Sequence, residues 1–371
     1  MRAGYRRPLR RDPFEYLKDL RRRAATGVIR LPWGGWCVSD PELADELLRS
    51  PEFNSGTSGF FGELLPTRAA QVAIGQAARN TLRAQVPEYR DALAGALADL
   101  PPASRWPATA SELVYRGLAD VLLHPGTPAG TRQLMAQALH GGVMFRSPHV
   151  WQRARAELLR AKLIAAVTRE VGCRRDGRSR DVLDAVLGAC PDDLTDRTVA
   201  EVFLVLFRSI VAPVGSTLAW SVLLAGLHHT SASPWPWPSE WIVREAMRHR
   251  PMVWMVGRTV DRPTEFGGLP FRPGDILSVS PFLVHHDQRH WADSEVFRPE
   301  RWAESGERGP YVPFGAGPYT CAGASVALTL MTETLTALTK DARLTVTGAD
   351  ARPAMAEGAV PRPFTVVRTP T

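Results

Sequence analysis

A glycine-rich segment near the C-terminal end contains one cysteine and leads directly into small and apolar residues that favour a helix. It reads Phe314-Gly315-Ala316-Gly317-Pro318-Tyr319-Thr320-Cys321-Ala322-Gly323. Glycines let the backbone fold tightly around the sulfur so that N–H groups can point at it, and the dipole of the following helix favours the thiolate. A single thiolate on a closed loop suits a haem iron, to which the sulfur donates electron density. We therefore expect Cys321 to be a metal ligand.

Two other segments carry charges at spacings that permit ion pairing. Glu245 and Arg248 stand three positions apart on an expected helix over residues 240–250, so they share a helix face. Further along, the chain reads Phe297-Arg298-Pro299-Glu300-Arg301-Trp302. With the cysteine loop, these segments resemble the ExxR, PER and FxxGxxxCxG elements of the cytochrome P450 family, in the family's order. The resemblance implies that Arg301 joins the ion pair of Glu245 and Arg248.

The resemblance also implies a cofactor, haem b, with the Cys321 thiolate as its proximal ligand. Arg258 resembles the arginine that binds a haem propionate in the family. Arg79 and Arg83, four residues apart, resemble the family's HxxxR propionate clamp with Arg in place of His, although a solvated basic helix face is an alternative interpretation. The expected haem-contacting residues are Phe314, Gly317, Tyr319, Cys321, Gly323, Arg258, Arg83 and Arg79.

The sequence departs from the family pattern in three places. Tyr319 stands where the family usually has Arg or His, and a phenol brings a hydrogen-bond donor but no positive charge. In the long helix, the positions of the usual acid and alcohol hold Ala212 and Pro213, unless a slip of one turn brings Ser216 and Thr217 there. The proline frees the carbonyl of Ser209. The third departure is a short Trp-Pro-Trp-Pro connection between residues 229 and 240.

These features predict a haem-thiolate oxidase or monooxygenase of secondary metabolism that acts on an organic small molecule or a peptide. Hydroxylation and oxidative coupling or cross-linking remain open as outcomes. Ala212, Pro213 and Ser209 are the candidate distal residues. The resemblance implies a ferredoxin and its reductase as electron donors, with peroxide as an alternative oxidant. The contrasting hypothesis is a non-catalytic haem-thiolate protein that binds a partner or senses a gas.

The elements expected around these motifs are mostly helical. Hydrophobic spacing predicts helices over residues 13–25, 41–49 and 328–338 and a long apolar helix from Thr195 to about His229, with helical texture from Ala69 to about Asp193. A hairpin is expected over residues 28–38, and small strands near Val256, 276–279 and 344–346. We predict one large domain over residues 1–371, mainly α with minor β and the cytochrome P450 fold, with a basic arm at 1–12.

The composition of the chain indicates which class of partner and which cellular compartment to expect. The 371 residues include 45 Lys+Arg and 38 Asp+Glu, a net charge of +7, which suits an acidic electron donor. No nucleic-acid-binding motif accompanies the arginines. Four cysteines without a CxxC pair favour a reducing compartment. An arginine and a proline within residues 202–227 favour a core helix over a membrane span, so we expect a cytoplasmic protein without a membrane anchor.

Overall fold

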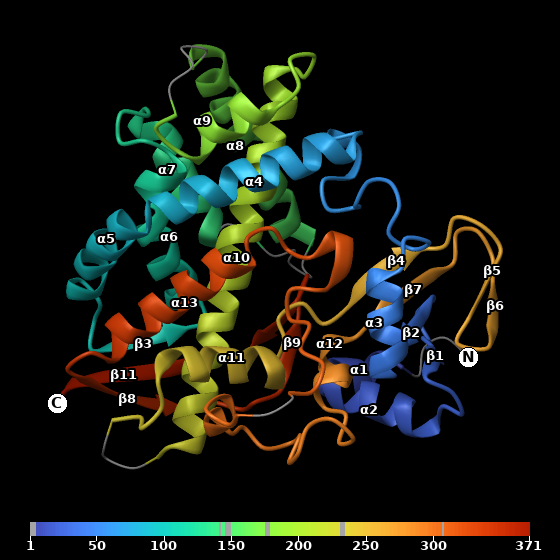
Figure 1. Cartoon of the computed structure of the whole chain (residues 1–371). Helices are drawn as coiled ribbons and strands as arrows, with labels where there is room; N and C mark the ends of the chain where they lie inside the picture. Colours follow the sequence, from blue (N-terminus) through green and yellow to red (C-terminus); the bar gives the residue numbers. More distant parts are fainter. Residues whose placement is uncertain (1–4, 141, 145–149, 175–178, 231–233, 306–307) are drawn as a thin grey trace.

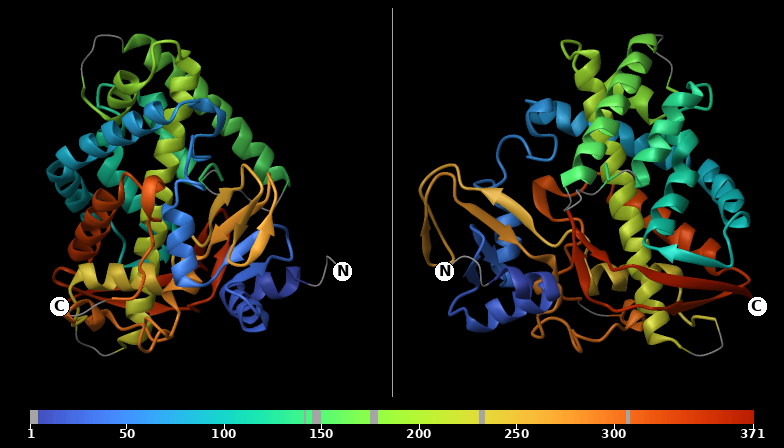
Figure 2. Two further views of the ribbon diagram at one scale, coloured as in Figure 1. Left: turned by 45° about the vertical axis from the view of Figure 1, so that its right-hand side comes forward. Right: turned by 180° about the vertical axis from the view of Figure 1, so that it is seen from behind.

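The computed structural model of the chain describes residues 5–140, 142–144, 150–174, 179–230, 234–305 and 308–371. It is a single, mainly helical domain with small sheets, as Figures 1 and 2 show. The helices are α1 (Arg6–Arg11), α2 (Pro13–Arg23), α3 (Pro41–Arg49), α4 (Arg68–Ala84), α5 (Val86–Ala98), α6 (Ala108–Leu122), α7 (Ala129–His140), α8 (Val150–Cys173), α9 (Val182–Ala189), α10 (Asp196–His228), α11 (Ser239–His249), α12 (Pro281–His285) and α13 (Ala324–Thr339), with short 3-10 turns η1 (Gly62–Leu64), η2 (Pro299–Trp302) and η3 (Gly317–Tyr319).

Helix α10 runs through the middle of the molecule, and the other long helices pack around it (Figure 1). The side chain of Thr195 accepts a hydrogen bond from the backbone of Thr198 and caps the helix start. By length and composition α10 could cross a membrane, but 72% of its most apolar stretch is buried inside the protein. The prediction of a central core helix is therefore confirmed.

Close helix contacts fix the position of α10. A Cβ on Gly215 would lie 2.8 Å from the Cα of Ser111 on α6, so only glycine permits this approach of the two helices. The indole of Trp220 donates a hydrogen bond of 2.8 Å to the carbonyl of Ala359. This bond ties the helix to the hairpin formed by β9 (Pro353–Met355) and β10 (Ala359–Pro361).

The strands form small sheets that join distant parts of the chain. One sheet has the order β1 (Val28–Arg30), β2 (Trp36–Val38), β7 (Ile276–Val279), β4 (Val256–Thr259), with β2 and β7 parallel. A second has the order β3 (Ala103–Trp106), β11 (Phe364–Pro370), β8 (Ala342–Thr347). A short hairpin pairs β5 (Thr264–Phe266) with β6 (Leu269–Phe271).

Most predicted elements lie where the sequence placed them. The hairpin over 28–38 and the helix over 41–49 are present, and helices α10 and α11 begin within one residue of their predicted starts. Strands β3, β5, β6, β9, β10 and β11 were not predicted. Strands β3 and β11 pair with each other across more than 250 residues, and the strands of the hairpins β5–β6 and β9–β10 have only three residues each. Residues 6–11 of the predicted basic arm form helix α1, and residues 1–4 lie outside the described residues.

Candidate functional site

The loop that carries Cys321 closes on itself just before helix α13. The backbone N–H of Cys321 donates to the carbonyl of Phe314 (3.0 Å), and the N–H of Ala324 donates to the carbonyl of Cys321 (3.2 Å). Gly315 and Gly317 both have positive φ angles, of 71° and 69°. A Cβ on Gly317 would lie only 2.3 Å from the carbonyl oxygen of Leu48, so this glycine is required for loop and helix α3 to meet.

Cys321 is reachable by solvent, yet protein atoms crowd the other sides of its sulfur. Desolvation raises the pKa of the thiol, while a hydrogen bond from the backbone of Gly323 acts in the opposite direction. The position of Cys321 just before α13 is therefore not enough to deprotonate its thiol. A metal ion at the sulfur would supply the missing positive charge, because coordination deprotonates a thiol outright.

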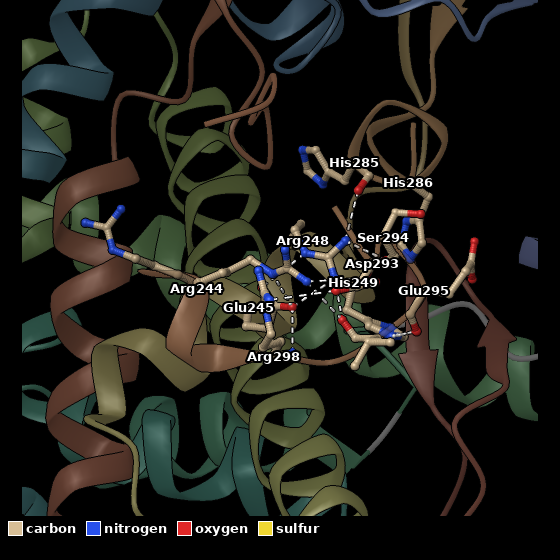
Figure 3. Close-up of polar contacts among 12 residues, drawn as sticks. Arg244, Glu245, Arg248, His249, His285, His286, Asp293, Ser294, Glu295 and Arg298 are labelled. Carbon is tan, nitrogen blue, oxygen red and sulfur yellow. Dashed lines mark hydrogen bonds and ion pairs between the residues drawn. The ribbon is translucent and has the colours of Figure 1, made fainter. Parts of the chain in front are cut away.

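A buried network of ion pairs and hydrogen bonds surrounds Glu245 and Arg248 on α11 (Figure 3). Glu245 and Arg248 are both fully buried, and Arg248 donates to the two carboxylate oxygens from Nε (3.0 Å) and Nη2 (2.8 Å). Arg301 adds a bond from Nε of 3.0 Å, and the indole of Trp302 adds one of 3.1 Å. The structure thus brings the predicted residues Glu245, Arg248 and Arg301 together around one carboxylate.

The same network reaches the cysteine loop through a histidine. Arg248 donates from Nη1 to the carbonyls of His285 (2.9 Å) and Ser294 (2.8 Å). The ring Nε2 of His285 in turn accepts the backbone N–H of Val312 at 2.8 Å, two residues before Phe314. Glu245 and Arg248 therefore position the start of the cysteine loop, which is a structural role and not a contact with substrate.

Two arginines flank the ring of Tyr319. The guanidinium of Arg68 lies 4.6 Å and that of Arg258 lies 5.0 Å from the ring centroid. The phenol donates to the carbonyls of Ser55 (2.9 Å) and Gly56 (3.0 Å). Tyr319 is therefore not a direct substitute for a basic residue: its ring holds two basic residues beside the cysteine loop.

Arg258 has an unused donor that suits a haem propionate. Its Nε donates to Asn54 (2.6 Å) and its Nη1 to the carbonyl of Gly257 (2.9 Å), but the buried Nη2 has no hydrogen-bond partner in the described part of the chain. Burial lowers the pKa of this arginine, and no carboxylate of the described residues pairs with it. A buried cation without a counter-ion is costly. The residues present therefore fit a carboxylate-bearing haem next to Cys321.

Arg79 and Arg83 lie on α4, four and eight positions after Gly75, and their predicted contact with a haem propionate stays a prediction. Arg79 bonds to the neighbouring Asn80 at 3.3 Å, and Arg83 is exposed. Helix α4 approaches the cysteine loop at Gly75, whose Cβ would lie 3.3 Å from that of Ala322. Among the described residues, the α4 arginine in contact with this loop is Arg68, whose Nη2 donates to the carbonyl of Pro318 at 3.1 Å. No local sequence signal links Arg68 to this loop, because Pro318 lies 250 positions further along the chain.

The middle of α10 has a partly exposed side. Val205, Arg208, Ser209 and Pro213 are accessible at helical spacing, whereas Ala212, Ser216 and Thr217 are buried. Pro213 lies inside the helix and offers no N–H to the carbonyl of Ser209. The hydroxyl of Ser209 donates to the carbonyl of Leu206 at 2.9 Å. This stretch of α10 is therefore the part of the core helix open to a ligand.

Comparison with known proteins agrees with this site. The cytochrome P450 family model matches residues 239–363, which span the ion network and the cysteine loop. Cyclooctatin synthase of Streptomyces melanosporofaciens is 27% identical over 191 residues, which cover 44% of this chain and 42% of that protein. The chain thus spans less than half the length of the curated relatives it matches.

Solved structures extend the likeness to the whole fold. P450 EryK in complex with erythromycin B superimposes with a TM-score of 0.75 at 22% identity, over 96% of this chain and 95% of that one. The retinoic-acid-bound cyanobacterial CYP120A1 superimposes with a TM-score of 0.78 at 20% identity, over 96% and 94%. Fold, family model and the motifs around Cys321 agree: residues 239–363 match the cytochrome P450 family model, and the chain has the cytochrome P450 fold of these solved structures.

Proposed function

We propose that the chain is a haem-thiolate monooxygenase of secondary metabolism that oxidises an organic small molecule or a peptide. The observation that carries the proposal is the closed loop of Cys321 beside the unpaired, buried Nη2 of Arg258. The names of the similar proteins, cyclooctatin synthase and EryK with erythromycin B, support a role in natural-product chemistry. When bound, the haem supplies the iron at which dioxygen is activated.

The chain's own residues would hold that cofactor in three ways. Cys321 would bind the iron through sulfur, with the N–H of Gly323 directed at it. Arg258 and Arg68 would take the haem carboxylates, held in place by the ring of Tyr319. Phe314 would close the loop around the sulfur, because its carbonyl accepts the N–H of Cys321.

Cys321→Ala is expected to abolish the strongly red-shifted Soret band that a thiolate-ligated ferrous haem gives with carbon monoxide, because alanine offers no ligand. The measurement is the reduced, CO-treated absorption spectrum of the purified protein. Cys173→Ala is the matched control, because Cys173 is also an exposed cysteine but lies on α8. A Cys321→Ala protein that keeps the band would refute the haem-thiolate assignment.

On the distal side, we infer that Ala212 and Pro213 occupy the positions of the acid and alcohol that usually deliver protons in the family. Ser209 is the replacement, because its carbonyl lacks a helix partner and its hydroxyl lies on the accessible side of α10. Water bound at that carbonyl would carry the proton, and Ser209 would hold it in place. This arrangement suits slow proton delivery. Hydroxylation and oxidative coupling would both draw on it, and peroxide would bypass it.

Pro213→Thr is expected to lower, by about twofold or more, the fraction of electrons lost as hydrogen peroxide, since a hydroxyl gives a direct proton donor. Hydrogen peroxide released and product formed are measured per NAD(P)H oxidised in the presence of a turnover substrate. Pro191→Thr, in the connection before α10, is the control. If Pro213→Thr leaves the hydrogen peroxide released per NAD(P)H unchanged, Pro213 has no distal role. Measurable turnover of any substrate would separately contradict the sensor hypothesis.

The electron donor is proposed from charge. A ferredoxin with its reductase suits the basic chain, and peroxide is the alternative oxidant. Arg79 and Arg83 lie on α4, the helix that passes the cysteine loop at Gly75, where an acidic donor would approach. We further propose that the protein works in the cytoplasm, because α10, its apolar helix, is buried in the core.

A further inference from the structure

A single charge interrupts the apolar middle of α10. Arg208 is the one Asp, Glu, Lys or Arg residue in the sequence between positions 202 and 228. A charged side chain in a core helix is costly to bury unless it has a partner or a ligand. Arg208 also lies on the partly exposed side of α10 that includes Val205, Ser209 and Pro213. The charge is therefore placed where a ligand can reach it.

The donors of Arg208 are only partly used. Its Nη2 forms an ion pair with Oε2 of Glu357 and lies 3.5 Å from the carbonyl of Met144. Its Nε is buried and has no hydrogen-bond partner among the residues that the structure describes. Nε and Nη2 form the edge of the guanidinium that binds both oxygens of a carboxylate side by side. Glu357 thus engages one half of a site built for a bidentate anion.

The side chain of Glu357 is exposed, whereas the hairpin that carries it is held in place by hydrogen bonds. It lies in the turn between β9 and β10, and its side chain is 49% exposed. The hairpin itself is held by Trp220 on α10 and by the bond from the N–H of Ala359 to the carbonyl of Met252, of 2.8 Å. The side chain can therefore leave Arg208 for water while the backbone stays in place.

Arg208 is close to the distal residues along the helix. It precedes Ala212 by four positions, so the two share a helix face about 6 Å apart along the axis. Arg208 also lines a small cavity between α8 and α10, whose lining includes Arg160 and Glu201 but not Ala212 or Pro213, so the proximity to the distal residues rests on the helix spacing. A molecule seated beside Ala212 and Pro213 would thus lie within reach of the guanidinium.

We propose that Arg208 is a substrate-recognition residue that binds a carboxylate of the substrate, and that Glu357 occupies its place in the ligand-free protein. The substrate is accordingly an organic acid. This inference rests on the proposed function, because it assumes that the substrate binds over a haem held by Cys321. It makes Arg208 a specificity residue with no part in activating oxygen.

The test uses ligands whose binding to the haem iron does not depend on Arg208. The probes are 4-(imidazol-1-yl)benzoate and 3-[4-(imidazol-1-yl)phenyl]propanoate, each paired with its primary amide, titrated into the ferric protein and followed by the Soret shift. The imidazole nitrogen binds the iron in every case, so the acid-to-amide affinity ratio measures recognition of the carboxylate. In the wild type we expect at least one acid to bind about tenfold or more tightly than its amide.

Variants separate recognition from a structural ion pair. Arg208→Gln is expected to bring the ratio to about one, and Arg208→Lys to give an intermediate value because it keeps the charge and loses the fork. Glu357→Gln is expected to raise the ratio severalfold, because it removes the competing carboxylate. Arg155→Gln, on the exposed side of α8, is the control and should leave the ratio unchanged.

The outcomes distinguish this inference from the proposed function. If no imidazole shifts the Soret band, the haem assignment fails. If every imidazole binds but acids and amides bind equally to the wild type, Arg208 does not recognise a carboxylate and the proposed function stands. A merely structural pair would make Arg208→Gln and Glu357→Gln change the ratio in the same direction, and that result would also overturn the inference.

Discussion

Replacing Glu245 with Gln is expected to lower the free energy of unfolding by about 3–5 kcal/mol, because it leaves two buried arginines without a counter-charge. Glu245 accepts five hydrogen bonds, from two nitrogens of Arg248, from Arg301, from Trp302 and from the backbone of Arg298. Gln can accept at only one oxygen. The measurement is equilibrium urea unfolding, with haem content recorded alongside.

The control for this variant lies on the same helix. Glu240 and Arg244 form an ion pair at i, i+4 on α11, but both side chains are at least one-third exposed. Glu240→Gln should therefore cost no more than about 0.5 kcal/mol. If Glu245→Gln and Glu240→Gln lower the free energy of unfolding equally, the buried network stabilises the fold no more than an exposed ion pair does. The proposed link from Glu245 to the cysteine loop is then wrong.

Lowering the pH from 7.5 to 5.5 is expected to reduce the free energy of unfolding by up to about 4 kcal/mol. Burial lowers the pKa of His249 and His286 well below the usual value, and it lowers the pKa of His285 to about 3. The three rings stay neutral in the fold but take up protons near pH 6.5 when the chain unfolds. The unfolded state therefore binds more protons, and stability falls as the pH drops below 6.5.

The surroundings of these rings add to the effect of burial. The charged and titratable groups near them are Arg248, Arg250, His228 and Lys18, all of which disfavour a further positive charge. Urea unfolding of the purified protein at intervals between pH 5.5 and 7.5 measures the dependence. This window excludes most carboxylate titration, which occurs below it.

A variant assigns the effect to particular rings. His286→Asn can keep the hydrogen bond to the carbonyl of Phe282, which the ring makes at 2.8 Å, while removing one titrating group. The pH-dependent loss should then shrink by about one third. His140→Asn replaces an exposed histidine and should change nothing. Equal pH profiles for His286→Asn and the wild type would show that this ring is not neutral in the folded protein.

Local signals in the sequence predicted much of the fold and of the site. Helix α3 starts with an aspartate cap and a proline at its first position, and those signals gave its start correctly. The cysteine loop and the Glu245–Arg248 pair are likewise contained in short segments. In each case the residues that determine the geometry are neighbours in the chain.

Local sequence signals could not predict the contacts between segments that lie far apart in the chain. The i, i+4 spacing of Arg79 and Arg83 indicates a shared helix side, but it says nothing of what that side meets. Arg68 contacts Pro318, 250 positions away, and Arg208 meets Glu357, 149 positions away. Strand β3 has four residues and pairs with β11 near the other end of the sequence. Periodicity carries no information on such partners.

The pairing of β3 with β11 has a consequence for the order of events during synthesis. Ala103 pairs with Val367, so β3 waits for about 260 further residues, which takes more than about ten seconds of translation. Strand β2 likewise cannot pair with β7 until residues 276–279 have been made. Two early strand edges are thus unpaired while most of the chain is made, and unpaired edges are templates for aggregation. Yield in a heterologous host should accordingly depend on chaperone supply and growth temperature more than on the thermodynamic stability of the finished fold.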